Sequence, residues 1–325
     1  MFCCEREEFN DILGIADNLI AYQNIDGGWP KNIDWLAILK PDSVINNLSE
    51  RYRQSTFDNI NTYPQIEYLA ETFMQSGIEK YRLAAVKGLN FILNQEYPKG
   101  GWRGWDANVI TFNDGVMTGI MNLLLDIEQG DKKYEWIDKE LRNRLSQAYQ
   151  RGLKVIIKSQ IIINGERTAW CQQHDFETYS PVQGRSYEHP SVTARESCDV
   201  ILFLMRISNP DSSIITAIES AVNWLQKVQI TGYRYSDVPI NERPYHETTI
   251  NFDREFVPDY SARPVWARYY DLKNSKPFLS QSDGKIVYQL SEISFDRRVG
   301  YEWYGFWPEK VLKAFEQWKS VNRKK

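Results

Sequence analysis

Apolar residues recur at helical spacing near the start of the chain and stop at a glycine pair, Gly27 and Gly28. Glycine accepts the left-handed backbone that often follows a helix, so this segment predicts an amphipathic helix that ends in a glycine turn. Its apolar positions are Ile12, Ile15, Ala16, Leu19 and Ile20. Sustained period-two strand patterns are scarce. Further helical runs cover residues 66–73, 116–127, 200–207 and 311–318.

The pattern at the end of this helix returns three times. QNIDGGWPKN, at residues 23–32, has weaker copies at residues 95–102, 160–170 and 229–233. The glutamines that begin the copies, at positions 23, 95, 160 and 229, are 72, 65 and 69 residues apart, about the length of a helical hairpin with its loops. The position four before each glutamine is apolar. We therefore predict an all-α fold, an α/α toroid, in which the glycines end helices and the tryptophan packs back across each hairpin.

A chain of 325 residues is long for one compact domain, yet barrels and toroids of this length form single units. We expect one domain over residues 1–325, with residues 1–9 as a flexible tail. Two polar stretches that contain Pro and Gly, residues 170–197 and 236–264, are longer than plain connectors. Long irregular loops in compact domains are commonly functional, so we expect the chemistry there.

Charge and cysteine usage exclude several classes of protein. The net charge of -4 argues against general nucleic-acid binding, which depends on clustered Lys and Arg. The four cysteines show no CxxC spacing or regular framework that would indicate a zinc site. No apolar run is long enough to predict a membrane span. The start MFCCEREEFN lacks the apolar segment of a signal peptide, so the protein is either cytoplasmic or has lost a leader.

Seven blocks along the chain resemble, in composition and order, the family 10 pectate lyases. They are QNIDGGWPKN (23–32), STFDNINTYPQIEYLA (55–70), TFNDGVMTGIM (111–121), TAWCQQHD (168–175), RSYEHPS (185–191), ARPVWARYYDL (262–272) and SFDRRVGYEWYG (294–305). Triterpene cyclases also carry Gln-Gly-Trp repeats, but they need acidic clusters, and this chain has no Asp-Asp pair. The resemblance implies an (α/α)3 toroid or incomplete α/α barrel with long irregular loops, acting as one catalytic domain. It implies a calcium-dependent lyase of polygalacturonate or oligogalacturonate. Such an enzyme would be secreted, periplasmic or on the cell surface, and we expect a monomer.

The resemblance places the metal ligands in the TFDN and TFND blocks. Asp58 and Asp114 are the candidates for Ca²⁺, which prefers carboxylate oxygens, and Asn59 and Asn113 are candidates to assist. Each block precedes an amphipathic run, so helix capping is the alternative role. The block at residues 56–62 reads TFDNINT where the family usually has TFDNGAT.

The resemblance also places the catalytic base at Arg185, ahead of a Tyr-Glu pair. β-Elimination removes the proton on C5, alpha to a carboxylate, while the C4 oxygen leaves. An arginine pKa is above roughly 12, so a base role needs nearby positive charge or alkaline conditions. Arg254 and Arg268 would supply charge and bind substrate carboxylates, since a guanidinium matches their planar shape. Alternatively, Arg185 is a solvated loop residue, and Arg268 is an ion-pair partner in a short helix formed by WARYYDL.

Three more residues are candidates for contact with substrate. Lys31 follows the GGWP turn and can pair with a carboxylate, while Trp105 and Tyr187 can stack on sugar rings. Two other functions stay open. The same fold can serve a non-catalytic protein that binds acidic glycans, or a hydrolase that uses paired carboxylates such as Glu188 and Asp175.

Overall fold

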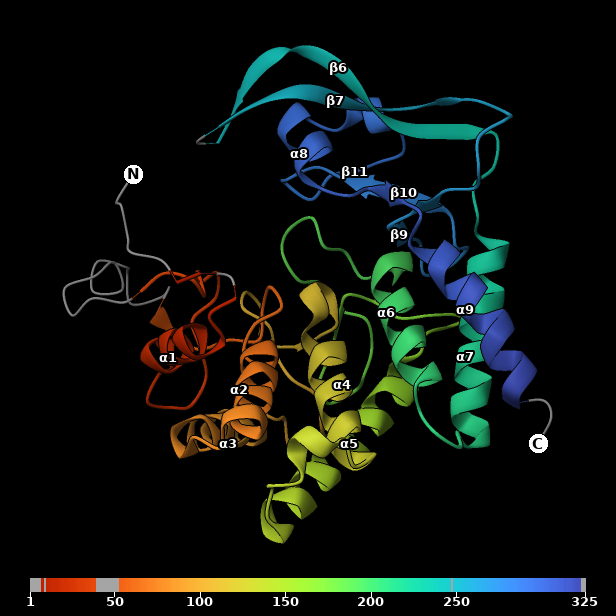
Figure 1. The fold of residues 1–325 in the computed structure, drawn as a ribbon. Coiled ribbons are helices and arrows are strands. Elements are labelled where there is room, and N and C mark those ends of the chain that lie inside the picture. The colour runs from red at the N-terminus through yellow and green to blue at the C-terminus, as the bar shows by residue number, and fades with distance from the viewer. Residues whose placement is uncertain (1–6, 9, 39–52, 247, 323–325) are drawn as a thin grey trace. The chain divides into compact units, whose positions relative to one another are not determined.

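The computed structural model describes residues 7, 8, 10–38, 53–246 and 248–322 (Figure 1). The chain forms two compact units, Met1–Val155 and Ile156–Lys325. The predicted tail at residues 1–9 lies outside the described residues except at positions 7 and 8. The single domain stays a prediction. None of the helices in the described ranges is long and apolar enough to cross a membrane.

The first unit is mainly helical, and its α2 and α3 pack side by side (Figure 1). Its first helix confirms the predicted amphipathic segment, because Ile15, Ala16 and Leu19 are buried. Asp11 caps that helix by accepting a hydrogen bond from Gly14 N at 2.8 Å. The elements are α1 (Ile12–Tyr22), α2 (Tyr63–Ser76), α3 (Glu79–Asn94), β1 (Ile110–Thr111), α4 (Val116–Glu128) and most of α5 (Lys139–Ser159), with 3-10 turns at Asn113–Gly115 and Lys132–Tyr134.

The second unit combines helices with small antiparallel sheets. Helix α6 packs against both α7 and α9 (Figure 1). The helices are α6 (Ala194–Met205), α7 (Ser212–Lys227), α8 (Phe295–Gly300) and α9 (Trp307–Asn322), with a 3-10 turn at Leu290–Glu292. The strands are β2 (Ile162–Ile163), β3 (Glu166–Arg167), β4 (Gln173–His174), β5 (Val192–Thr193), β6 (Tyr233–Tyr245), β7 (Thr248–Pro258), β8 (Trp266–Ala267), β9 (Tyr269–Tyr270), β10 (Pro277–Ser280), β11 (Ile286–Val287) and β12 (Tyr304–Gly305). Strands β11, β10, β9 and β5 form a four-stranded sheet in that order.

The prediction of an all-α fold, an (α/α)3 toroid or incomplete α/α barrel, is wrong: the fold is mixed α/β. The largest difference is the long hairpin β6–β7 within the stretch predicted as an irregular loop (Figure 1). Its strands pair from Tyr233↔Pro258 to Tyr245↔Thr248 with a register shift between Pro239 and Arg243. Most of its side chains are exposed or half-buried, so no apolar face imposes the alternation that identifies a strand. Many other strands have only two residues, too few for any period to appear.

A tryptophan closes each of four loops by donating its indole N–H to a carbonyl near the end of the preceding helix. Trp29 donates to Leu19 O, Trp102 to Ile92 O, Trp170 to Ile156 O and Trp266 to Leu225 O, at 2.7 to 2.8 Å. All four rings are essentially buried. The sequence repeat therefore marks a recurring packing device, as predicted for its first three copies. In the fourth copy the predicted Tyr233 instead begins β6, and Trp266 takes the closing position.

The glutamine and the first glycine of the repeat have local roles. Gln23 Nε2 donates to Gly27 O within its loop and to Ala84 O on α3, and Gln160 makes the same pair of bonds to Thr168 O and Ala217 O. Gly27 has φ 95°, and a Cβ there would lie 2.3 Å from Lys87 O, so only glycine fits. These contacts fix the loops that carry the candidate site residues.

Candidate active site

In the first unit, Asp58 and Lys31 form a largely buried ion pair. Asp58 Oδ2 lies 3.0 Å from Lys31 Nζ, and the side chains are 12% and 13% exposed. Lys31 Nζ also lies 4.5 Å from the centroid of the Trp105 ring, a cation–π distance. Gly104 lets this loop approach closely, since a Cβ there would be 3.3 Å from Asp58 Oδ1. Three predicted residues, Lys31, Asp58 and Trp105, are therefore in one cluster.

Asp114 lies in a loop that is hydrogen-bonded to the segment just after Asp58. Ile60 N donates to Asp114 O at 3.3 Å, and Asn113 Nδ2 donates to Asp114 Oδ2 at 3.0 Å. Asp114, Asn59 and Ile60 have φ of 50°, 56° and 55°, a conformation that β-branched isoleucine rarely adopts. Asn59 Nδ2 donates to Asn32 Oδ1 at 3.0 Å. A positive φ is strained for residues other than glycine, and these three residues of the two loops adopt it.

The alternative role of helix capping does not describe these aspartates. The N-cap residues of α2 and α4 are Thr62 and Gly115. Asp58, Asp114 and the amides of Asn59 and Asn113 instead supply hard oxygen donors from two neighbouring loops, which suits Ca²⁺. No group of three or more His, Cys, Asp or Glu side chains that could hold a metal occurs in the described ranges. Two aspartates and two amides would not complete the six to eight oxygens that Ca²⁺ needs, so a calcium ion held here would require further ligands.

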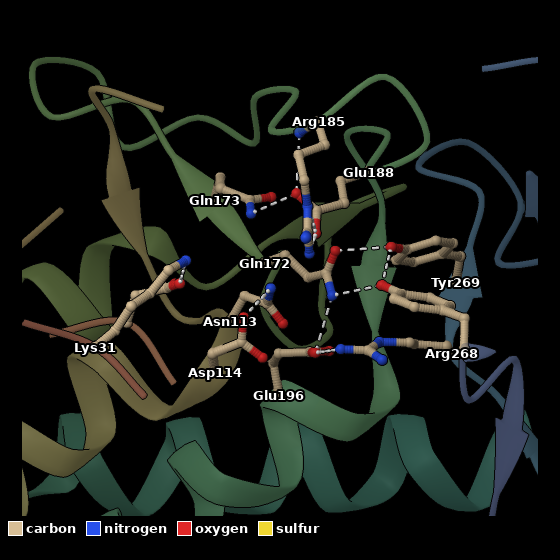
Figure 2. A network of polar contacts seen from close by, with 12 residues as sticks. Lys31, Asn113, Asp114, Gln172, Gln173, Arg185, Glu188, Glu196, Arg268 and Tyr269 are labelled. Atoms are coloured by element: carbon tan, nitrogen blue, oxygen red, sulfur yellow. Dashed lines mark hydrogen bonds and ion pairs between the residues drawn. The ribbon is translucent and has the colours of Figure 1, made fainter. Parts of the chain in front are cut away.

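In the second unit, Arg185 is bound to the buried carboxylate of Glu188 (Figure 2). Arg185 Nε and Nη2 donate to Glu188 Oε1, the former at 2.9 Å, while Arg185 N donates to Oε2 at 2.9 Å. Gln173 Nε2 also donates to Glu188 Oε2 at 3.2 Å. Burial alone would lower the pKa of Arg185, but the hydrogen bonds and charge of Glu188 raise it above its ordinary value. The side chain of Arg185 remains 37% exposed.

Arg268 forms a fully buried ion pair with Glu196 (Figure 2). Gln172 Nε2 donates to the same carboxylate at 2.9 Å, and Tyr269 Oη donates to Gln172 Oε1 at 2.8 Å. Burial would raise the pKa of Glu196, but the charge of Arg268 and the Gln172 hydrogen bond lower it below its ordinary value. The contacts match the ion-pair role left open for Arg268. The predicted WARYYDL helix is wrong, because β8 and β9 occupy this segment and pair with other strands.

Arg254 lies on β7, where its Nε donates to Asp237 Oδ1 and its Nη1 to Tyr301 O, both at 3.2 Å. The side chain is 18% exposed and lines a cavity of about 620 Å³ together with Tyr235 and Trp307. Arg254 is thus half-buried between a carboxylate and a backbone carbonyl. It also lines a second cavity of about 680 Å³, together with Tyr233 and Tyr288.

Tyr301 joins the predicted arginines of the second unit into one cluster. The Arg268 guanidinium lies 4.3 Å from the Tyr301 centroid, and the Tyr187 ring lies 5.7 Å from it, edge to face. The Arg185 guanidinium lies 5.0 Å from the Tyr187 centroid. Arg297, which the sequence did not single out, lies 3.7 Å from the centroid of Tyr187 and 4.5 Å from that of Tyr301. The residues Glu196, Gln172, Tyr301 and Arg297 were missed, although all but Glu196 fall in blocks that resemble the family.

Glu188 and Asp175 do not form the carboxylate pair of a hydrolase. Glu188 is bound to Arg185 in an ion pair. Asp175 Oδ1 accepts hydrogen bonds from Glu177 N, Thr178 N and Thr178 Oγ1, the pattern of a turn residue. Each carboxylate is therefore engaged in contacts of its own loop, and no contact joins the two as an acid–base pair among the interactions described.

Comparison with known proteins places the chain in a family. The family model described as pectic acid lyase matches residues 23–312. Two solved structures of a family 10 polysaccharide lyase from Cellvibrio cellulosa are 28% identical to the chain, with a TM-score of 0.77. One of them is an alanine mutant in complex with trigalacturonic acid. Each alignment covers 93% of this chain, and it covers 92% of the mutant structure and 91% of the other. No curated protein matches significantly. The chain therefore belongs to the pectic acid lyase family and is a polysaccharide lyase.

Proposed function

We propose that this protein is a calcium-dependent pectate lyase that cleaves polygalacturonate by anti β-elimination, with Arg185 as the Brønsted base. The observation that carries the proposal is the match over 93% of the chain to a lyase whose mutant was solved with trigalacturonic acid. The clustering of Lys31, Asp58 and Trp105 in one unit and of the arginines around Tyr301 in the other supports it. Such an enzyme would act outside the cell, and as a monomer.

The reaction needs a base, a source of a proton for the leaving oxygen, and cations beside the uronate carboxylate. A base takes the C5 proton, electrons from the C5–H bond form the C4=C5 double bond, and the C4–O bond breaks so that the leaving oxygen takes up a proton. The products are a chain with a 4,5-unsaturated end and a chain with a new reducing end. Negative charge develops on the uronate carboxylate as the proton leaves, so cations beside that group stabilise the transition state most.

The first unit supplies the groups for the carboxylate. Asp58 and Asp114, with Asn59, would hold Ca²⁺, which supplies positive charge at the substrate carboxylate when bound. Lys31 pairs with Asp58 in the present arrangement, and if Asp58 held a calcium ion, Lys31 would be released to pair with a substrate carboxylate. Trp105 holds the Lys31 ammonium against its ring and so limits where the charge can move.

The second unit supplies the base and further cations. Arg185 must be neutral to accept a proton, and its pair with Glu188 opposes this. Alkaline conditions favour the neutral form, so we expect an alkaline pH optimum. Tyr187, whose ring lies near the guanidinium groups of both Arg185 and Arg297, is the candidate for stacking on a sugar. Arg254 is the remaining candidate for a substrate carboxylate, while Arg268 holds Tyr301 and Glu196 in place.

The test is an absorbance assay for 4,5-unsaturated product from polygalacturonate at alkaline pH. Product should form with calcium and stop when a chelator removes it. Arg185→Ala should abolish turnover while leaving the binding of trigalacturonate nearly intact, whereas the exposed Arg167→Ala in the same unit should behave as wild type. If the calcium-loaded protein forms no unsaturated product, the proposal is wrong.

One observation favours a second candidate, a non-catalytic protein that binds acidic glycans. An arginine kept protonated by Glu188 is suited to binding carboxylates rather than to accepting protons. Titration with trigalacturonate alongside the absorbance assay separates the two. Saturable binding without product at any alkaline pH would favour the binding protein.

A further inference from the structure

A cavity of about 200 Å³ lies in the first unit, beside the Asp58–Lys31 pair. Its lining includes the aromatic residues Phe57, Phe91 and Trp105 and the polar side chains of Gln54, Gln95 and Arg103. Pockets for drug-sized ligands enclose roughly 300–1,000 Å³. A smaller cavity with aromatic and amide walls suits one sugar ring of a chain.

Arg103 is the cationic residue of this lining. Its Nη2 donates to Trp105 O at 3.4 Å, and no carboxylate pairs with it among the described residues. An exposed arginine is commonly only solvated, but here the backbone is fixed on both sides. Trp102 is fully buried and bonded to Ile92 O, and Arg103 forms a bridge with Ile110. The charge is therefore held at the cavity by a rigid support.

The cavity lies next to the predicted calcium ligand Asp58. Gly104 and Trp105 line it, and the same two residues approach the Asp58–Lys31 pair, Gly104 through its contact with Asp58 Oδ1 and Trp105 through Lys31 Nζ. A wall of two residues thus separates the two places. In polygalacturonate every sugar carries a carboxylate, so the neighbour of a sugar bound at Asp58 presents one to this cavity.

We propose that this cavity is a further substrate subsite, which takes one galacturonate residue and pairs its carboxylate with Arg103. The inference rests on the proposed function for the identity of the chain that enters. Phe57 and Phe91, whose centroids lie 5.1 Å apart, form the apolar side, and Trp105 forms the wall shared with the site at Asp58. The subsite contributes to binding of long chains and takes no part in proton transfer.

The test compares Arg103→Gln with Arg144→Gln on substrates of increasing length. Arg144 is an exposed arginine of the same unit, bonded to Asn90 Oδ1, and lies outside the lining of this cavity. Arg103→Gln should lower kcat/KM on polygalacturonate about tenfold, the effect of one charge-assisted hydrogen bond, with kcat at saturation unchanged. The loss should vanish on the shortest oligogalacturonate that is cleaved. Arg144→Gln should match wild type throughout.

An equal loss on all chain lengths, or none on any, overturns the subsite. If wild type forms no unsaturated product at all, the proposed function fails, and calorimetric titration with hexagalacturonate then tests the subsite alone. Weaker binding of hexagalacturonate by Arg103→Gln than by wild type supports it, and equal affinity overturns it. A neutral galactose oligomer should show no difference between the two proteins, since it offers no carboxylate.

Discussion

His174 should make the protein lose stability as the pH falls below neutral. Its ring is fully buried, and Cys171 N donates to its Nε2 at 3.0 Å. A backbone N–H can only donate, so Nε2 is unprotonated and Nδ1 carries the proton, which is donated to Tyr179 O at 2.9 Å. Burial lowers the pKa of His174 from 6.5 to about 4. A charged His174 would lose the Cys171 bond and keep only the Tyr179 carbonyl as a hydrogen-bond partner, which does not offset the cost of burying its charge.

The magnitude follows from linkage. Between pH 6.5 and about 4 the unfolded chain binds a proton at this position and the folded chain does not, so stability falls as the pH falls. The difference of about 2.5 pH units corresponds to about 3 kcal/mol at 1.36 kcal/mol per unit. The contribution is intact above pH 6.5 and lost by about pH 4.

The assay is urea unfolding, followed by tryptophan fluorescence, from pH 4 to pH 7. Wild type should lose about 3 kcal/mol more over this range than His174→Gln, which does not titrate, even though that variant is less stable at pH 7. His246→Gln, which removes an exposed histidine, should follow wild type. Parallel pH profiles for wild type and His174→Gln would refute the reasoning.

Two further predictions concern the ion pairs of the second unit. Glu188→Gln removes the charge that raises the pKa of Arg185, so if Arg185 is the base, the rise of kcat/KM with pH should move to lower pH; an unchanged pH–rate profile would exclude Arg185 as the titrating base. Glu196→Ala leaves the Arg268 charge buried without its partner and should lower the free energy of unfolding by about 3–5 kcal/mol, measured by urea denaturation. Glu166→Ala, which removes an exposed pair, should leave it nearly unchanged; equal effects of the two would contradict the burial argument.

Helices could be predicted from the sequence because burial of one face imposes a period on it. The runs at residues 66–73 and 116–127 lie within α2 and α4, and the run at 311–318 lies within α9. The β6–β7 hairpin could not be predicted, because its strands are held by backbone pairing and none of their side chains is fully buried, so no apolar face marks them in the sequence. The predicted fold class was therefore wrong because the conformation of this hairpin depends on hydrogen bonds and not on apolar contacts.

The candidate site divides in the same way. Asp58, Asp114 and Arg185 were predicted as site residues because each stands in a short block that resembles the family. Their partners lie far along the chain or are set by local geometry: Tyr301 contacts Tyr187 from more than a hundred positions away, and a single sequence carries no signal for that pairing. Arg268 was placed in a helix because its block is apolar and aromatic, a composition that short strands share.

The tryptophan closures have a consequence for how such a protein can change. The four indole-to-carbonyl bonds span 10, 10, 14 and 41 residues, yet each returns the chain to the end of its own helix. The longest span contains the whole β6–β7 hairpin, which bears Arg254. Because both ends of such a loop are anchored at the end of one helix, the segment between them can be lengthened, shortened or replaced without moving that helix.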